Sequence, residues 1–73
     1  MKEQLYDVVI FNIETRVIDT IAGKDMKLDT GGFYTAEKRL DTVLPRLNEH
    51  YHAVIVKAGK FKKGDRVLKK DYA

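Results

Sequence analysis

The stretch that most resembles a catalytic motif is LDTGGF, residues 28–33. Aspartic proteases present a catalytic carboxylate in such an Asp-Thr-Gly triplet, and they need two of these carboxylates sharing one proton. This chain holds one copy, and Gly32 follows the triplet where the retroviral type has Ala or Ser. A predicted helix, capped by Thr35, comes directly afterwards instead of β structure. We therefore interpret Asp29 as part of a turn that leads into this helix.

Other catalytic arrangements find little support in the residue types present. The chain contains no serine and no cysteine, so the usual covalent nucleophiles are reduced to threonine, lysine or a carboxylate. His50 and His52 could meet a metal ion together with Glu49, but no further ligand stands at a recognisable spacing. Neither Gly59 nor Gly64 stands in a phosphate-binding motif. We expect no catalytic residues, no metal site and no cofactor.

Length and composition indicate one small globular domain over residues 1–73. Hydrophobic residues make up 44% of the chain and charged residues 34%, which suits a folded domain. The longest apolar run, VVIF, is far shorter than the roughly 20 residues that span a bilayer. The N-terminus shows no signal-peptide pattern. We expect a cytoplasmic protein without membrane contact.

Two kinds of hydrophobic pattern divide the chain into elements. Residues 5–13, 16–21 and 52–58 are rich in β-branched and aromatic residues and predict three strands. Residues 22–32 contain three glycines and predict a long loop, with a short extended piece around Met26. A fourth, edge strand around Arg66 is an alternative to a flexible tail.

A helix is predicted from Thr35 onward. Apolar residues recur there at helical spacing, namely Ala36, Leu40, Val43, Leu44, Leu47 and Tyr51. Thr35 has a side chain suited to the N-cap. Pro45 removes a backbone donor, and because it lies on the polar side we expect it to bend the helix rather than end it.

These elements predict an α+β fold with the order β-β-α-β, a sheet of three or four strands with one amphipathic helix packed on one face. A crossover through the helix would give the spatial order 2-1-3. The first strand is apolar on both faces, so the second face must be covered by the tail or by a partner. We favour a partner protein or a homodimer through this open sheet face.

Charge is distributed unevenly along the chain. The net charge is +3, yet residues 1–56 carry seven Lys/Arg against nine Asp/Glu, and residues 57–73 carry seven against two. Basic side chains interleaved with an aromatic residue can neutralise phosphates and stack a base. The candidate nucleic-acid contacts are Lys60, Phe61, Lys62, Lys63, Arg66, Lys69 and Lys70. A solvated basic edge that prevents aggregation is the alternative.

A protein-binding role is the function we favour from the sequence. An apolar sheet face beside an adaptable glycine-rich rim is what such a module needs. The rim residues proposed for partner binding are Lys24, Asp25, Met26, Lys27, Asp29 and Phe33.

The segment FYTAEKRLDTVLPRLNEHY, residues 33–51, stands between a predicted hairpin and a strand with a basic end. In size, layout and helix entry the chain resembles small accessory proteins of bacteriophages and prophages. This resemblance implies a non-catalytic protein that binds and modulates a host factor or nucleic acid, and it assigns no site residues.

Overall fold

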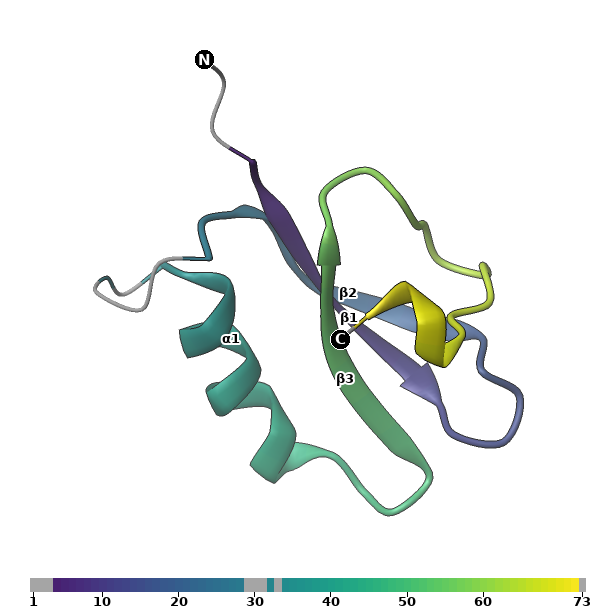
Figure 1. The fold of residues 1–73 in the computed structure, drawn as a ribbon. Helices are drawn as coiled ribbons and strands as arrows, with labels where there is room; N and C mark the ends of the chain where they lie inside the picture. The colour runs from purple at the N-terminus through teal and green to yellow at the C-terminus, as the bar shows by residue number, and fades with distance from the viewer. Residues whose placement is uncertain (1–3, 29–31, 33, 73) are drawn as a thin grey trace.

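The computed structural model describes residues 4–28, 32 and 34–72 and forms a three-stranded sheet with one α-helix (Figure 1). The strand order is β2-β1-β3, and both neighbours run antiparallel to β1. This confirms the predicted β-β-α-β layout. The elements are β1 (Tyr6–Asn12), β2 (Ile18–Met26), α1 (Ala36–Val43), the 3-10 turn η1 (Leu44–Arg46), β3 (Tyr51–Lys57) and the 3-10 turn η2 (Lys69–Asp71).

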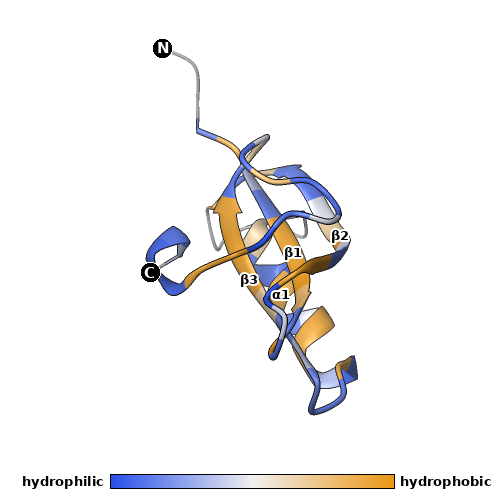
Figure 2. Ribbon diagram, turned by 90° about the vertical axis from the view of Figure 1, so that its right-hand side faces the viewer, coloured by the Kyte–Doolittle hydropathy of each residue, from blue (hydrophilic) through white to orange (hydrophobic). Residues whose placement is uncertain are grey.

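The central strand β1 separates two small cores, as its apolar character on both faces predicts. Val8 lies on the helix side, where it packs with Met26, Ala36 and Ala53. On the other side a second buried cluster contains Val9, Phe11, Ile18, Val54, Val56 and Val67. In Figure 2 hydrophobic residues colour much of the three strands, in line with a sheet covered on both faces.

Strand β2 is longer than predicted, because it continues through the glycine-rich stretch to Met26. The prediction of a loop beginning at residue 22 is therefore wrong. Register shifts against β1 insert extra residues into β2, and Asp25 takes a positive φ of 53°. Gly23 allows close packing here, since a Cβ at this position would meet the Met26 side chain. These bulges accommodate the extra residues of β2 while the strand stays paired with β1.

Helix α1 begins where the sequence predicts. The Thr35 side chain accepts a hydrogen bond from the Lys38 N–H at 3.2 Å. The apolar stripe from Ala36 to Leu47 packs on the helix-side core, which confirms the predicted face. The expected gentle bend at Pro45 is wrong: the α-helix ends at Val43 and a single 3-10 turn contains the proline. Pro45 has no N–H for a further i→i−4 bond, so the chain turns toward β3.

The chain's own C-terminal segment, residues 58–72, lies on the sheet face opposite α1 (Figure 1). Val67 is fully buried in the second core, and Phe61 and Tyr72 pack against it. The sheet face that we expected a partner or a second copy to cover is thus covered by the chain's own C-terminal segment. The predicted fourth strand is reduced to one antiparallel bridge between Val17 and Arg66. Among the described residues, no helix is long and apolar enough to cross a membrane.

Candidate functional site

The residues proposed as a partner-binding rim do not form one exposed surface. Lys24, Asp25 and Lys27 are exposed. Met26, however, is only 8% exposed and belongs to the helix-side core, so the prediction that it forms part of an exposed rim is wrong. Asp29 and Phe33 lie outside the described residues. The rim is therefore a strand end joined to the start of α1, where the Ala36 N–H donates to the Lys27 carbonyl at 2.7 Å.

A buried carboxylate fixes this strand end, and the sequence analysis overlooked it. Asp7 in β1 is 1% exposed. Its Oδ1 accepts from the Asp25 N–H at 2.9 Å, and its Oδ2 accepts from the Gly59 N–H at 3.1 Å. Asp7 therefore joins the bulge of β2 to the turn after β3. Such pairing is what a buried polar group requires, and it indicates a structural role.

The basic side chains of the C-terminal segment point outward from a well-anchored backbone. Lys60, Lys62, Lys63, Arg66, Lys69 and Lys70 are exposed. Phe61 is half-buried against the second core, with the Lys60 Nζ 5.4 Å from its ring centroid. Its ring therefore stabilises the fold and is only partly available to stack on a base.

Both acidic residues of this segment accept backbone hydrogen bonds within turns of the same segment. Asp65 accepts from the Lys62 N–H at 2.9 Å. Asp71 accepts from the Leu68 N–H at 2.9 Å and lies 3.5 Å from the Lys60 Nζ. The hydrogen bond from the Leu68 backbone, with help from Lys60 and against the effect of burial, holds the pKa of Asp71 below its ordinary value. Both carboxylates therefore order the backbone of the segment, and Asp71 also offsets part of the charge of Lys60.

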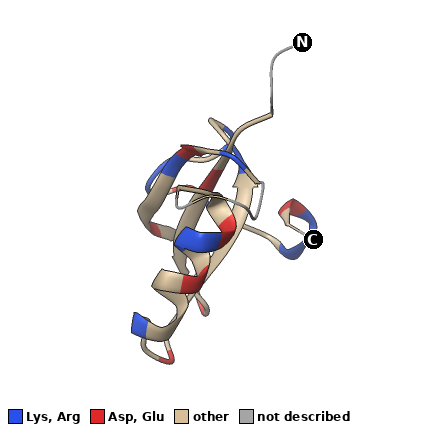
Figure 3. Ribbon diagram, turned by 90° about the vertical axis from the view of Figure 1, so that its left-hand side faces the viewer, with Lys and Arg blue, Asp and Glu red and all other residues tan. Residues whose placement is uncertain are grey.

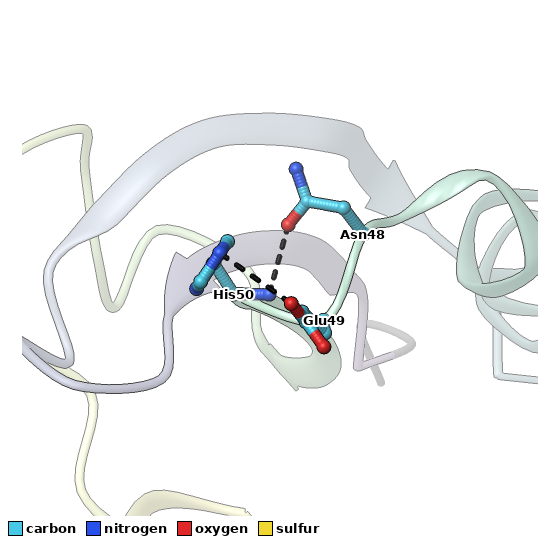
Figure 4. Close-up of polar contacts among 3 residues, drawn as sticks. All are labelled: Asn48, Glu49 and His50. Carbon is cyan, nitrogen blue, oxygen red and sulfur yellow. Dashed lines mark hydrogen bonds and ion pairs between the residues drawn. The ribbon is translucent and has the colours of Figure 1, made fainter.

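The histidines that bracket Tyr51 point to different surroundings. The Nε2 of His50 lies 3.8 Å from Glu49, and the His50 N–H donates to the Asn48 side chain at 2.8 Å (Figure 4). His52 instead places its ring edge against Phe11, with ring centroids 5.8 Å apart. The part of the chain that the structure describes contains no group of three His, Cys, Asp or Glu residues able to hold a metal ion.

Arg16 holds the end of the C-terminal segment on the sheet. Its Nε donates to the Val67 carbonyl at 2.9 Å, and its Nη2 donates to the Tyr72 hydroxyl at 3.0 Å. The guanidinium carbon lies 4.7 Å from the Phe11 ring centroid, a cation–π geometry. Tyr72 is thereby fixed beside β3.

The outer edge of β3 pairs with no further strand of the described sheet, although Ala53 on this edge is only 2% exposed. Antiparallel strands direct the backbone groups of alternate residues toward a given neighbour. The Ala58 N–H donates to Leu5 and the Ile13 N–H donates to His50, so the even-numbered residues of β3 face β1. The N–H and C=O groups of Ala53 and Ile55 therefore point outward. Within residues 4–28, 32 and 34–72 no hydrogen-bond partner exists for them.

Two apolar grooves follow this edge and form what we call the β3 trough. One, of about 280 Å³, is lined by Leu40, Leu44, His52, Ala53, Val54, Ile55 and Tyr72. The next, of about 400 Å³, is lined by Tyr6, Leu28, Ile55, Val56, Lys57, Asp71 and Tyr72. Ile55 and Tyr72 belong to both grooves, so the trough runs along β3 between α1 and the C-terminal segment. Ala53 is 2% exposed at its floor.

The other edge of the sheet is protected. The start of β2 pairs with the C-terminal segment, because the Ile18 N–H donates to Asp65 and the Gly64 N–H donates to Ile18. Farther along, β2 is bulged and exposes the charged residues Lys24 and Asp25. Bulges and charges are how proteins protect an edge from pairing. In contrast, β3 pairs with β1 in an uninterrupted register over seven residues.

The sequence analysis missed the β3 trough although a signal for it was present. The predicted order 2-1-3 makes the third strand an edge, and residues 53–56 contain no glycine, proline or charge that would protect it. Arg16 and Tyr72 gave no comparable signal, because their contact joins residues 56 positions apart.

Neither protein-family models, nor curated proteins, nor solved structures give a match to this chain, so its function must be argued from the geometry alone.

Proposed function

We propose that this chain is a non-catalytic binding protein that takes up an extended segment of a partner protein as a new strand beside β3. The observation that carries the proposal is the unpaired outer edge of β3, which lies in an apolar trough. In strand addition, main-chain hydrogen bonds supply affinity and flanking pockets supply specificity. Ala53 and Ile55 offer the hydrogen bonds, and the trough offers the pockets.

The energetic argument concerns Ala53 in particular. Its residue surface is 2% exposed, so its outward N–H and C=O groups have little contact with water. A buried backbone group without a partner costs about 1–3 kcal/mol. An incoming strand would have to displace Tyr72, which lines both grooves, before it could pair these groups, and it would then cover the half-buried Ile55.

The proposed setting follows the resemblance to phage accessory proteins. Such a protein would act in the cytoplasm, and its partner would be a host factor with an accessible strand or an extended segment. The charge of the neighbouring C-terminal segment would favour an acidic partner and would accelerate the encounter more than it would add affinity.

A photo-crosslinking amino acid placed at Ile55 tests the proposal in the native host. The matched control is the same amino acid at Leu68, which is 41% exposed and lines neither groove. We expect position 55 to crosslink to an extended segment of a protein, with or without nuclease treatment. Crosslinks that arise only from position 68, or that disappear with nuclease, would contradict strand addition.

Nucleic-acid binding is a second candidate, supported by the outward basic side chains of the C-terminal segment. With Asp65 and Asp71 engaged in turns, these cations could contact phosphates. Phe61 contributes little stacking, so we expect weak and sequence-independent binding. A titration with single-stranded DNA should then show affinity that falls steeply as salt rises. Affinity that is absent at low salt would eliminate this candidate.

A further inference from the structure

We infer that residues 68–72 form an autoinhibitory latch, which covers the outer edge of β3 and opens as a unit before another strand can pair there. The inference rests on the proposed function, because such a latch inhibits only if this edge takes up a strand. It adds a regulatory step to that function, namely the release of Tyr72 from the two grooves of the β3 trough. The hinge of the latch follows the buried Val67.

The first argument is the position of the latch. Tyr72 lines both grooves, and η2 lies beside the outer edge of β3 in two views of the ribbon (Figure 1 and Figure 2). Ala53 is 2% exposed, although β3 pairs with no further strand of the described sheet on this side. Asp71 lines the second groove together with Ile55. The latch therefore occupies space that an incoming strand needs.

The second argument is that backbone hydrogen bonds anchor the C-terminal segment to the sheet as far as Val67. The Val67 N–H donates to the Arg16 carbonyl at 2.8 Å, and the Ile18 N–H donates to the Asp65 carbonyl at 2.8 Å. Beyond this point, within the described part of the chain, the hydrogen bonds of the residue 68–72 backbone are internal to the latch. A segment held in this way opens locally at a lower free energy than global unfolding requires.

The third argument is that the latch can move as one unit. The Asp71 N–H donates to the Leu68 carbonyl at 2.9 Å, and the Asp71 carboxylate accepts from the Leu68 N–H at 2.9 Å. These two bonds close η2 on itself, so the turn can leave β3 with both intact. The charges of η2 lie beside the C-terminus (Figure 3), where Asp71 pairs at 3.5 Å with Lys60 of the same C-terminal segment. An ion pair of this length, with Lys60 44% exposed, contributes little to stability.

The fourth argument is that one side chain, that of Tyr72, holds the latch closed. Its hydroxyl accepts from the Arg16 Nη2 at 3.0 Å, and its ring centroid lies 6.2 Å from that of Phe11. Leu68, the other large apolar residue of the latch, is 41% exposed and lines neither groove. When the latch opens, Arg16 keeps its second hydrogen bond, to the Val67 carbonyl. Displacement of Tyr72 therefore frees the edge without detaching the rest of the segment.

Native-state amide exchange in low concentrations of urea tests the latch in the wild-type chain. Local opening exposes little surface, so its free energy depends weakly on urea, whereas the free energy of global unfolding depends steeply on it. We expect exchange at Ala53 to show the weak dependence and exchange at Val54, which pairs with β1, to show the steep one. Equal dependence at the two positions would mean that only global unfolding uncovers Ala53, and would overturn the latch.

Substitutions within the latch test which side chain closes it. Tyr72→Ala should raise the rate of amide exchange at Ala53 about tenfold or more and leave that of Val54 unchanged. Tyr72→Phe keeps the ring but loses the hydroxyl that binds Arg16, so a smaller rise should follow. Leu68→Ala changes the same segment outside both grooves and, as the matched control, should have no effect. No rise at Ala53 in Tyr72→Ala, or an equal rise at Val54, overturns the latch.

Photo-crosslinking from position 55 in the native host connects the latch to the proposed function. Because a latch lowers the fraction of chains competent to bind, we expect Tyr72→Ala to raise the yield of crosslinked partner about threefold or more. Leu68→Ala should give the wild-type yield. A yield that Tyr72→Ala leaves unchanged or lowers overturns the inhibitory role, while the proposed function stands. Faster exchange at Ala53 in Tyr72→Ala, with no crosslink from any of these chains, overturns the proposed function and the inhibitory role with it.

Discussion

Asp7 shows at the scale of one residue how this small domain holds irregular backbone in place. The bulge at Asp25, with its positive φ, and the turn at Gly59 both donate to this one carboxylate. A buried acidic residue near the start of β1 breaks the apolar pattern of this strand. Its position next to two irregular segments explains why it is tolerated.

Replacement of Asp7 by Ala should therefore destabilise the fold. Two backbone N–H groups would lose their acceptor, and we expect the free energy of unfolding to fall by about 1–3 kcal/mol. Urea denaturation followed by circular dichroism measures this change. Asp41→Ala, at an exposed position on α1, is the matched control and should change stability by less than about 0.5 kcal/mol. Equal effects of the two substitutions would contradict the role of Asp7.

Arg16 is the second residue whose role comes from distant contacts. Arg16→Ala removes both hydrogen bonds to the C-terminal segment and leaves the Val67 carbonyl without its side-chain donor. We expect a loss of about 1–3 kcal/mol in stability and faster amide exchange in residues 67–72. Arg16→Lys keeps the charge but not the planar fork of donors, so it should recover only part of the loss. Unchanged exchange in residues 67–72 would show that Arg16 does not hold the segment.

At the scale of elements, we expect the attachment of the C-terminal segment to depend on pH through Asp71. Because the folded state favours the ionised form of Asp71, this residue's contribution to stability is complete above its unfolded pKa, about 3.9. It is lost as pH falls through the lower pKa of the folded state. We expect carbon NMR of the Asp71 carboxyl to show a midpoint below 3.9, with η2 loosening over the same pH range. Asp71→Asn should remove this pH dependence, and a midpoint above 3.9 would contradict it.

The sequence predicted the elements whose signals are local. The runs of β-branched and aromatic residues predicted all three strands, and Thr35 with the stripe from Ala36 predicted the start and face of α1. The extension of β2 to Met26 could not be predicted in this way, because the bulges depend on contacts with Asp7 and on space beside Gly23. The end of α1 at Val43 depends on where the chain must turn toward β3.

At the scale of the whole molecule, the candidate site lies at the edge strand β3 and not on the second sheet face, because the C-terminal segment covers that face. The sequence indicated an open face, and the structure leaves instead an edge strand, β3, that pairs with no further strand of the described sheet. The C-terminal segment contributes twice to this outcome, because Phe61 and Val67 cover the face and Tyr72 forms one wall of the trough. The order 2-1-3 already made the third strand an edge, but the two walls of the candidate site could not be predicted from the sequence, since they come from α1 and from a segment that has no helical or strand pattern.

The most direct test of strand addition at β3 is amide hydrogen exchange at Ile55, measured by NMR residue by residue. It should be compared in dilute protein and with a partner captured through position 55. We predict that Val54 and Val56 are protected throughout, because they pair with β1, and that the half-buried Ile55 becomes protected when a strand occupies the edge. Binding that protects other residues while Ile55 continues to exchange as in the dilute protein would contradict strand addition at β3.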